Sequence, residues 1–429
     1  MADDFIFIVF GGTGDLAKRK LAPAFASLLD KKEISSKSIL VGIARGDFSD
    51  SAYKKLIVDS SKSDKDKKIL SKLDIRFFKG DASDPSSLSN LSTYLENLPV
   101  KNTKKIFYLA TSFNLFTPIV SELKRQGLNS SSSIIFEKPF GSSGKSAKEI
   151  ESFLSTAFKP EQIFRIDHYL AKETVQNIGT LKFSNIFFEP LLNKKFVESI
   201  EVIVKEDLGV GERLGYYNDS GAIKDMIQNH LVQVLSLVMM DRPEKSFHEK
   251  KISVLRSLSF DTSKPNVIGQ YESYMKEAKA KGIPVSKTET FARLFFKSSS
   301  ERWVGTEFIL QTGKKLDKKE GKIIINFKQN NKIVIDIYPT QDVHIYFNTR
   351  SPESEKLEQA MFDFCHDCKF GPNTVDEYAV LISEATKGNH SLFPSSSEIL
   401  ESWRIIEQID KSKIKFVSYK DGEKAGNIK

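Results

Sequence analysis

Residues 164–177, FRIDHYLAKETVQN, place several charged side chains among apolar neighbours. Asp167, His168 and Lys172 are the residues here whose types could do chemistry. An imidazole can exchange a proton near neutral pH, a carboxylate can stabilise the resulting imidazolium, and an ammonium can bind an anion. Neighbouring side chains of an extended chain point to opposite faces, so Asp167 and His168 cannot easily form one catalytic pair. A second histidine is therefore needed.

The segment KDMIQNHLVQVL supplies such a histidine, His230. Apolar residues at helical spacing predict a long helix over residues 221–240, on which Asp225 and Asn229 share one face. A histidine placed there could take the hydroxyl proton of an alcohol while a hydride leaves the carbon. From the pattern alone, His230 could also be a hydrogen-bonded histidine of the core.

A glycine loop, FGGTGDLAKRK, follows the apolar run 5–10 and opens a predicted helix. The dinucleotide fingerprint G-x-G-x-x-G/A occurs here in a variant form, with Gly11, Gly14 and Ala17, and with Gly12 as a further small residue. Glycines allow a tight turn and the close approach of backbone N–H groups to a pyrophosphate, and the helix N-terminus is partly positive. The loop therefore predicts a dinucleotide cofactor.

Residues at the ends of two other predicted strands refine this expectation. Arg45 ends the second strand, where a guanidinium suits the 2′-phosphate of NADP. Thr13 could add a hydroxyl, whereas Asp47 leaves NAD possible as a weaker acceptor. Lys138 follows the buried run of IIFEKPFG, and the carboxyl ends of parallel strands line the ligand site. Pro139, the next residue, could follow a cis bond.

The elements that must position these residues change in character along the chain. Up to about residue 165, short apolar runs alternate with helical patterns, which is typical of a doubly wound parallel sheet. Later runs (289–297, 306–316, 321–328, 332–339 and 342–348) are joined by short polar turns and predict an antiparallel sheet. We therefore expect an α/β Rossmann-type domain over 1–165 and an α+β domain over 166–429.

Composition excludes several classes of function. The formal charge is +8, but the basic residues are spread along the chain and mixed with acids, so we expect no nucleic-acid partner. No apolar run approaches membrane-spanning length and the N-terminus lacks a basic start, which favours a cytoplasmic protein without membrane association. Cys365 and Cys368 could be a redox pair or half a metal site. We expect two free thiols in a reducing compartment and no metal.

Five motifs occur in an order and spacing that resemble one family: GGTGDLAKRK, EKPFG, RIDHYLAKE, DMIQNHLVQ and ERWVGTEFILQTGKKL. Together they resemble the glucose-6-phosphate dehydrogenase family, from about Phe5 to Trp403. The motif R-I-D-H-Y-L-x-K-E is highly specific to that family.

The resemblance implies roles at matching positions. For catalysis it implies a base, His230, and a carboxylate that stabilises its charged form, Asp167. It implies contacts with the 6-phosphate from His168, Tyr169 and Lys172, with the sugar hydroxyls from Glu206 and Asp225, and with the sugar and nicotinamide ends of the site from Lys138 and Lys314. For NADP it implies Gly11, Gly12, Thr13, Gly14, Asp15, Leu16, Arg45, Tyr108 and Lys138.

The resemblance also implies a reaction and an assembly. Glucose 6-phosphate would be oxidised at C1 to 6-phosphoglucono-lactone, at the entry to the oxidative pentose phosphate pathway, by a homodimer or homotetramer. Two segments depart from the family pattern. Thr111 and Ser112 stand where a proline pair is usual, and Asp336 and Tyr338 stand where animal members have basic residues for a second NADP, which we do not expect here.

Two other functions remain open at this point. Sugar oxidoreductases of the inositol or glucose-fructose type share the dinucleotide domain and the E-K-P strand end, but they lack the D-H-Y-L-x-K cluster. A catalytically dead homologue acting as a binding protein would be expected to have lost His230, Asp167 or Lys172, and all three are present.

Overall fold

The computed structural model describes residues 4–100, 103–284, 286–352, 356–371 and 376–429, which form two compact units. The first unit comprises Met1–Gly141, Lys145–Ala171 and Val375–Ser396, and the second comprises Ser142–Gly144, Lys172–Thr374 and Ser397–Lys429. A segment near the C-terminus thus belongs with the N-terminal unit. The single domain boundary expected after residue 165 stays a prediction.

A six-stranded, all-parallel sheet forms the centre of the first unit, with strand order β3-β2-β1-β4-β5-β6. β1 (Phe5–Phe10) is central and buried at every residue, as its unbroken apolar sequence requires. The other strands are β2 (Ile39–Ala44), β3 (Asp74–Lys79), β4 (Lys104–Leu109), β5 (Ser132–Phe136) and β6 (Ile163–Arg165). The predicted doubly wound sheet is confirmed, and its strand order reverses between β1 and β4, where ligands bind in such folds.

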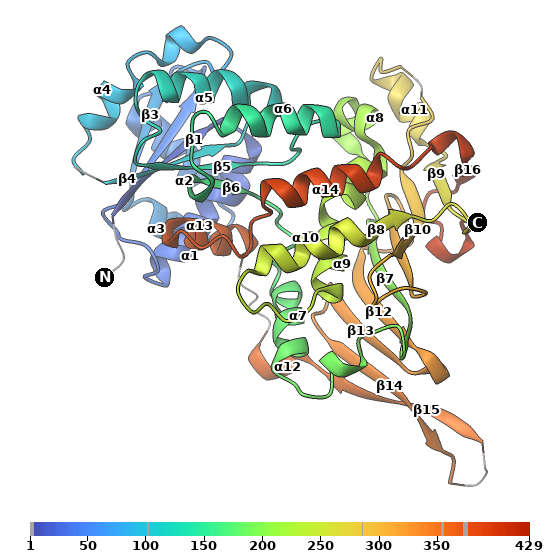
Figure 1. Ribbon diagram of the computed structural model, residues 1–429. Helices are drawn as coiled ribbons and strands as arrows, with labels where there is room; N and C mark the ends of the chain where they lie inside the picture. The colour runs from blue at the N-terminus through green and yellow to red at the C-terminus, as the bar shows by residue number, and fades with distance from the viewer. Residues whose placement is uncertain (1–3, 101–102, 285, 353–355, 372–375) are drawn as a thin grey trace. The chain divides into compact units, whose positions relative to one another are not determined.

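Helices complete the first unit: α1 (Ala22–Asp30), α2 (Asp50–Ser60), α3 (Asp64–Leu70), α4 (Leu91–Glu96), α5 (Phe116–Arg125), α6 (Gly144–Leu154) and α13 (Glu377–Lys387). Although it is remote in sequence, α13 lies beside α1 (Figure 1). Ala379, Ile382 and Ala385 recur at helical spacing and are buried in the same core as Phe25. The apolar face of α13 therefore joins it to this unit.

A ten-stranded sheet forms the second unit, with the order β15-β14-β13-β12-β7-β11-β10-β9-β16 and with β8 paired to β10. The pairs β7–β11 and β9–β16 are parallel and the others are antiparallel, so the predicted antiparallel sheet is confirmed in its main part. The strands are β7 (Val197–Lys205), β8 (Leu258–Phe260), β9 (Val267–Tyr271), β10 (Phe291–Ser298), β11 (Glu307–Gly313), β12 (Glu320–Phe327), β13 (Lys332–Tyr338), β14 (Val343–Arg350), β15 (Leu357–Phe364) and β16 (Lys415–Tyr419).

Burial along this sheet follows the alternation of its side chains. On β13, Ile333, Ile335 and Ile337 are buried, and the residues between them are only partly covered. The β14–β15 hairpin extends away from the rest of the sheet (Figure 1), and most of β15 is exposed. Leu357 and Phe362 remain 72% and 66% exposed, so this hairpin presents apolar surface.

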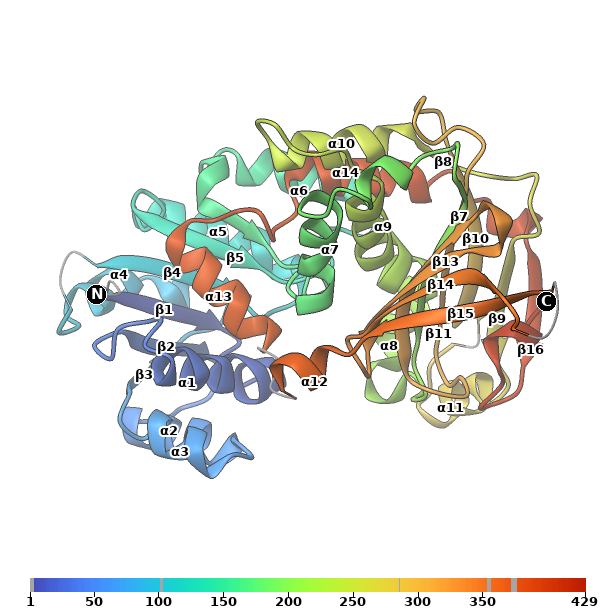
Figure 2. The same cartoon turned by 90° about the horizontal axis from the view of Figure 1, so that it is seen from below.

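The second unit also contains helices, of which α7 and α9 cover the same face of the sheet (Figure 2). They are α7 (Glu173–Phe183), α8 (Leu214–Ala222), α9 (Val232–Met239), α10 (Phe247–Ser257), α11 (Tyr274–Ala280), α12 (His366–Phe370) and α14 (Ser396–Ile406). A π-helix, Ile223–Leu231, leads directly into α9. Within the described ranges, none of the helices combines the length and apolar character needed to cross a bilayer.

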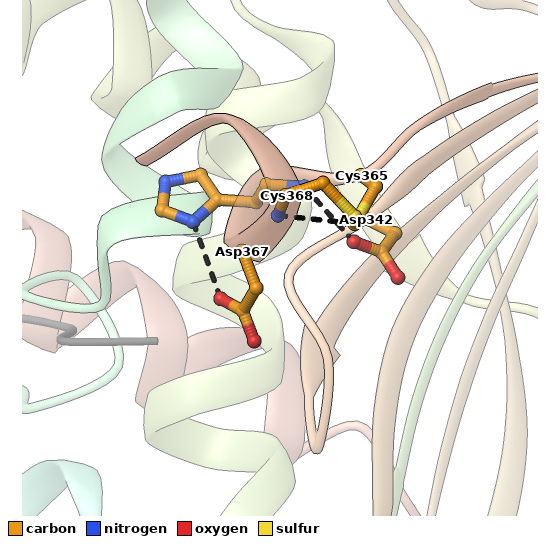
Figure 3. The surroundings of a disulfide bond; sticks show 5 residues. Asp342, Cys365, Asp367 and Cys368 are labelled. Atoms are coloured by element: carbon orange, nitrogen blue, oxygen red, sulfur yellow. Dashed lines mark hydrogen bonds and ion pairs between the residues drawn. A yellow bond between two sulfur atoms is a disulfide. The ribbon is translucent and has the colours of Figure 1, made fainter. Parts of the chain in front are cut away.

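One expectation about the second unit is wrong. Cys365 and Cys368, predicted as free thiols, are joined by a disulfide (Figure 3). The two residues flank the first turn of α12, and this turn brings their side chains within bonding distance.

Candidate active site

The glycine loop makes a tight turn after β1, and its glycines allow the turn to pack closely against β2. Gly11 adopts a φ of +83°, and the N–H groups of Gly11 and Gly12 both donate to Ile43 O at 3.0 Å. A Cβ on Gly12 would lie 2.6 Å from the Cα of Gly42 on β2. The N–H of Gly14 also donates within the turn, to Gly11 O at 2.9 Å, so the N–H groups of Thr13, Asp15 and Leu16 are better placed to donate to a phosphate.

The charged groups beyond β2 bear on the choice of dinucleotide. Arg45 is exposed directly after the strand, whereas Asp47 pairs with Lys79 at 3.2 Å. Asp15 in the glycine loop contacts Lys18 and Arg19 at 3.8 and 3.7 Å. The basic side chains around the loop would favour an anionic ligand.

Tyr108 lies on β4, and its side chain is fully buried. Its hydroxyl donates to the carboxylate of Glu137, and burial raises the pKa of both groups. Lys138 follows Glu137 beyond the end of β5, and its peptide bond with Pro139 is cis, as the sequence allowed. Sequence reasoning missed Glu137, although this residue opens the E-K-P motif. The hydroxyl of Tyr108 is thus hydrogen-bonded to the residue that directly precedes Lys138.

The segment that contains Asp167 is a turn, so the expectation that Asp167 and His168 alternate along an extended chain is wrong. Asp167 is 2% exposed, its Oδ1 accepts from the N–H of Tyr169, and its backbone oxygen accepts from the N–H of Leu170, both at 3.0 Å. Aspartate favours such turns because its side chain competes for nearby N–H groups. The rings of His168 and Tyr169 lie 5.0 Å apart.

The π-helix of the second unit changes how Asp225 and His230 relate. Both are buried, at 2% and 0% exposure. In an α-helix of 3.6 residues per turn, a separation of five residues rotates the side chain by about 140°. In a π-helix the hydrogen bonds join residues five apart, which brings these two residues about one turn apart on the same side. The expected α-helix is therefore wrong in this segment, but Asp225 and Asn229, four residues apart, still lie about one turn apart on one side of the π-helix.

Three side chains implied as substrate ligands meet in the second unit. The Lys314 ammonium pairs with the Glu206 carboxylate and lies 3.8 Å from Asp225 Oδ2. Arg213 contacts the other oxygen of Asp225 at 3.3 Å. Lys315 instead pairs with carboxylates on a different side, those of Glu277 and Asp421 at 2.8 and 3.1 Å. Of the two adjacent lysines, Lys314 is therefore the one grouped with the other ligands.

The start of the π-helix is held by a residue that sequence reasoning missed, Glu289. Its backbone oxygen accepts from the N–H of Ala222 at 2.8 Å and its Oε1 accepts from that of Ile223 at 3.3 Å. Gly221 adopts a φ of +67°, and a Cβ there would meet Glu289 Oε1 at 2.4 Å. Lys411 pairs with the remaining oxygen at 2.7 Å. No local pattern signals this contact, because its members come from distant segments.

Tyr217 is a second residue that sequence reasoning missed. Its ring lies 5.3 Å from the Lys314 ammonium, and it is 1% exposed. Burial raises the pKa of its hydroxyl, which has no hydrogen-bond partner among the described residues. Such a hydroxyl is available to a bound ligand.

Lys172 lies at the N-terminus of α7, and its ammonium is 5.4 Å from the ring centre of Tyr338. A helix N-terminus and an ammonium both favour an anion. Asp167 belongs to the first unit and His230 to the second, so their pairing stays a prediction.

Comparisons with known proteins cover nearly the whole chain. Residues 8–177 match the model of the glucose-6-phosphate dehydrogenase NAD binding domain, and residues 179–427 match that of the C-terminal domain. Glucose-6-phosphate 1-dehydrogenase of Borreliella burgdorferi is 34% identical over 95% of this chain and 91% of the relative. The Bacillus subtilis enzyme is 31% identical over the same shares. A solved glucose-6-phosphate dehydrogenase in complex with glucose 6-phosphate has a TM-score of 0.90 and 28% identity, over 99% of this chain and 96% of that one.

Proposed function

This chain belongs to the glucose-6-phosphate dehydrogenase family, and we propose that it oxidises glucose 6-phosphate with NADP as its preferred acceptor. Glucose 6-phosphate is oxidised at C1 to 6-phosphoglucono-1,5-lactone, the first step of the oxidative pentose phosphate pathway. A hydride passes to the nicotinamide, and the hydroxyl proton passes to a base. The grouping of Glu206, Asp225 and Lys314 is the observation that carries the proposal furthest, because it joins residues from three distant segments.

His230 is the base in this proposal, and Asp167 stabilises its charged form. A buried histidine on a firmly held helix can be aligned with one hydroxyl, which general-base catalysis requires. Glu289 and Gly221 hold the start of that helix. The carboxylates of Glu206 and Asp225 accept hydrogen bonds from sugar hydroxyls, while Lys314, together with Lys138, contacts the substrate and the nicotinamide.

His168, Tyr169 and Lys172 bind the 6-phosphate. Lys172 contributes a positive charge at the N-terminus of α7, whose dipole also favours an anion. His168 and Tyr169 add hydrogen-bond donors from the turn that follows β6. Charge-assisted hydrogen bonds of this kind distinguish glucose 6-phosphate from free glucose.

The dinucleotide binds at the glycine loop, with N–H donors from Thr13, Asp15 and Leu16. Arg45 is exposed and can reach a 2′-phosphate, whereas Asp47 already pairs with Lys79 and is less available to a ribose hydroxyl. This arrangement supports NADP, with NAD as the weaker acceptor.

The enzyme acts as a homodimer or homotetramer in the cytoplasm. The β14–β15 hairpin carries several exposed apolar side chains: Leu357, Met361, Phe362 and Phe364. Alternation along β15 places Phe362 and Phe364 on one face and Leu357 and Met361 on the other. Exposed apolar side chains of this kind are typical of protein interfaces. A second copy of the chain is the partner that we propose for this surface.

Initial rates test the proposal directly. Reduction of NADP and of NAD is followed at 340 nm with glucose 6-phosphate, two other hexose phosphates and free glucose. We expect the highest kcat/KM with glucose 6-phosphate and NADP. A preference for unphosphorylated polyols would contradict the substrate, and an equal or higher kcat/KM with NAD would contradict the role of Arg45.

A further inference from the structure

Lys314 is the first residue of the loop, residues 314–319, that connects β11 to β12. Its N–H donates to Thr290 O at 2.9 Å. The next residue, Lys315, has a φ of +55°, which a residue with a side chain rarely adopts unless its surroundings hold it there. The position of the Lys314 ammonium therefore depends on the contacts that fix the backbone of this loop.

A segment near the C-terminus, residues 419–423, lies against the same loop. Three hydrogen bonds join the two: from the Tyr419 hydroxyl to Lys314 O at 2.7 Å, from the Gly422 N–H to Lys315 O at 2.8 Å, and from the Asp317 N–H to Glu423 O at 3.1 Å. Lys314 and Tyr419 are 105 positions apart in the chain, so no local pattern could predict this contact. The C-terminal segment therefore holds the backbone around Lys314.

Tyr419 ends a chain of hydrogen bonds whose direction is fixed. The N–H of Tyr271 donates to Thr290 Oγ1 at 3.0 Å, and this hydroxyl lies 2.8 Å from that of Tyr419. Since the carbonyl oxygen of Lys314 can only accept, the Tyr419 hydroxyl donates its one hydrogen there and accepts from Thr290. Thr290 and Tyr419 are 0% and 3% exposed, and burial raises the pKa of the Tyr419 hydroxyl, which keeps its proton. This buried donor fixes the Lys314 peptide group in one orientation.

The side chain of Lys315 fastens the loop to the same segment. Its ammonium pairs with Asp421 at 3.1 Å and with a carboxylate of α11 at 2.8 Å. The Lys314 ammonium instead pairs with Glu206 and lies 3.8 Å from Asp225 Oδ2. The two adjacent ammonium groups are thus held apart, and only that of Lys314 joins the carboxylates to which we assign the sugar hydroxyls.

We propose that Tyr419 is a positioning residue of the substrate site, which holds the backbone of Lys314 so that its ammonium stays beside these two carboxylates. The turn of residues 421–423 supports the same loop. Without the Tyr419 hydroxyl, the Lys314 carbonyl loses its donor inside the core, and the loop shifts towards another one. Catalysis is sensitive to small displacements of the groups that align a substrate. This inference rests on the proposed role of Lys314 as a substrate ligand.

Tyr419→Phe tests the proposal, because it removes the hydroxyl and keeps the buried ring. Initial rates with NADP should show that kcat/KM for glucose 6-phosphate falls about tenfold. Tyr274→Phe is the matched control: Tyr274 belongs to the same core, and its hydroxyl donates to Asn218 Oδ1 at 3.2 Å. This control loses a comparable hydrogen bond and should keep its kcat/KM. If Tyr419→Phe keeps the wild-type value, or if both variants lose activity equally, the proposal is overturned.

A double-mutant cycle with Lys314→Ala separates positioning from a general effect on packing. Lys314→Ala alone should lower kcat/KM about 10- to 100-fold, as expected for the loss of a charged hydrogen-bond donor. In that background, Tyr419→Phe should change kcat/KM by less than about twofold, whereas a further loss of about tenfold would overturn the proposal. An unchanged kcat/KM in Lys314→Ala would remove this lysine from the substrate site. A loss in Lys314→Ala without one in Tyr419→Phe would overturn the positioning role alone.

Discussion

The glycine turn of the first unit and the Lys314 cluster of the second are built in opposite ways. Gly11, Gly12 and Thr13 are neighbours in sequence, and their conformation follows from one tight turn between β1 and the next helix. Glu206, Asp225 and Lys314 come from three distant segments and meet only through the fold. A local motif can therefore be predicted from its sequence, whereas the geometry of a cluster of distant residues depends on how every element that carries them is packed.

The largest effect is expected from His230→Asn, on the π-helix that also supplies Asp225 to the Lys314 cluster. Because the variant lacks the base, kcat should fall by about 10²- to 10⁴-fold, with KM for glucose 6-phosphate nearly unchanged. Steady-state rates with NADP measure both values. His344→Asn, on β14, serves as the control and should keep its turnover, because His344 is partly exposed and pairs with Asp336 and Asp363. An active His230→Asn enzyme would contradict the assignment of the base.

Glu398→Gln tests how far the second unit depends on charges from distant segments. Glu398 is fully buried and pairs with the buried Lys251 at 2.6 Å. The variant leaves that lysine buried without its counter-charge, which should lower the free energy of unfolding by about 3–5 kcal/mol. Urea denaturation at neutral pH measures the loss.

The same carboxylate should make stability depend on pH. Burial raises the pKa of Glu398, but Lys251 and His248 lower it by more, so that the pKa is lowered to about 2. Since this pKa lies below that of an exposed glutamate, the ionised Glu398 contributes fully to the free energy of unfolding above about pH 4.5. The contribution is lost as the pH falls towards 2. Glu401→Gln, which removes pairs with the more exposed Arg256 and Arg404, is the control and should cost less than about 1 kcal/mol. Equal losses in both variants would contradict a special role for the buried pair.

Gly12→Ala tests the local motif. The added Cβ would meet the Gly42 backbone at 2.6 Å, so the turn must shift, with a loss of about 1–3 kcal/mol in stability and a higher KM for NADP. Gly179→Ala is the matched control, because a Cβ there meets nothing within 4 Å and the residue lies inside α7. An unaltered KM for NADP in Gly12→Ala would show that the turn is more tolerant than its packing indicates.

Arg45→Ala should give the smallest effect. Loss of one exposed guanidinium should raise KM for NADP about tenfold and leave KM for NAD unchanged. The ratio of kcat/KM for the two dinucleotides measures this change. Arg76→Ala provides a control, because Arg76 pairs with Asp50 and Asp74 and should not affect the preference. A parallel loss with both cofactors would remove Arg45 from the 2′-phosphate.

Sequence patterns predicted the parallel sheet, the main antiparallel strands and the family, and all three are confirmed. Apolar periodicity is a local property, which is why β1 and the glycine loop could be identified. The strands β6, β8, β9, β15 and β16 were missed. For β8 and β16 the pairing partners lie far along the chain. The residue roles themselves stay predictions.

Other features depended on packing that no local pattern records. The π-helix was predicted as an α-helix because its apolar spacing fits both, and the turn at Asp167 was predicted as extended chain. The disulfide was missed because C-x-x-C also suits free thiols.

By itself, the sequence determined the parallel sheet, the main antiparallel strands, the dinucleotide loop and the family, since these depend on residue type and short-range spacing. Only the tertiary structure decided that Lys314 and not Lys315 joins Glu206 and Asp225, and that Glu289 holds the helix of His230. These contacts join residues far apart in the chain, and their geometry exists only once the sheet and helices have packed.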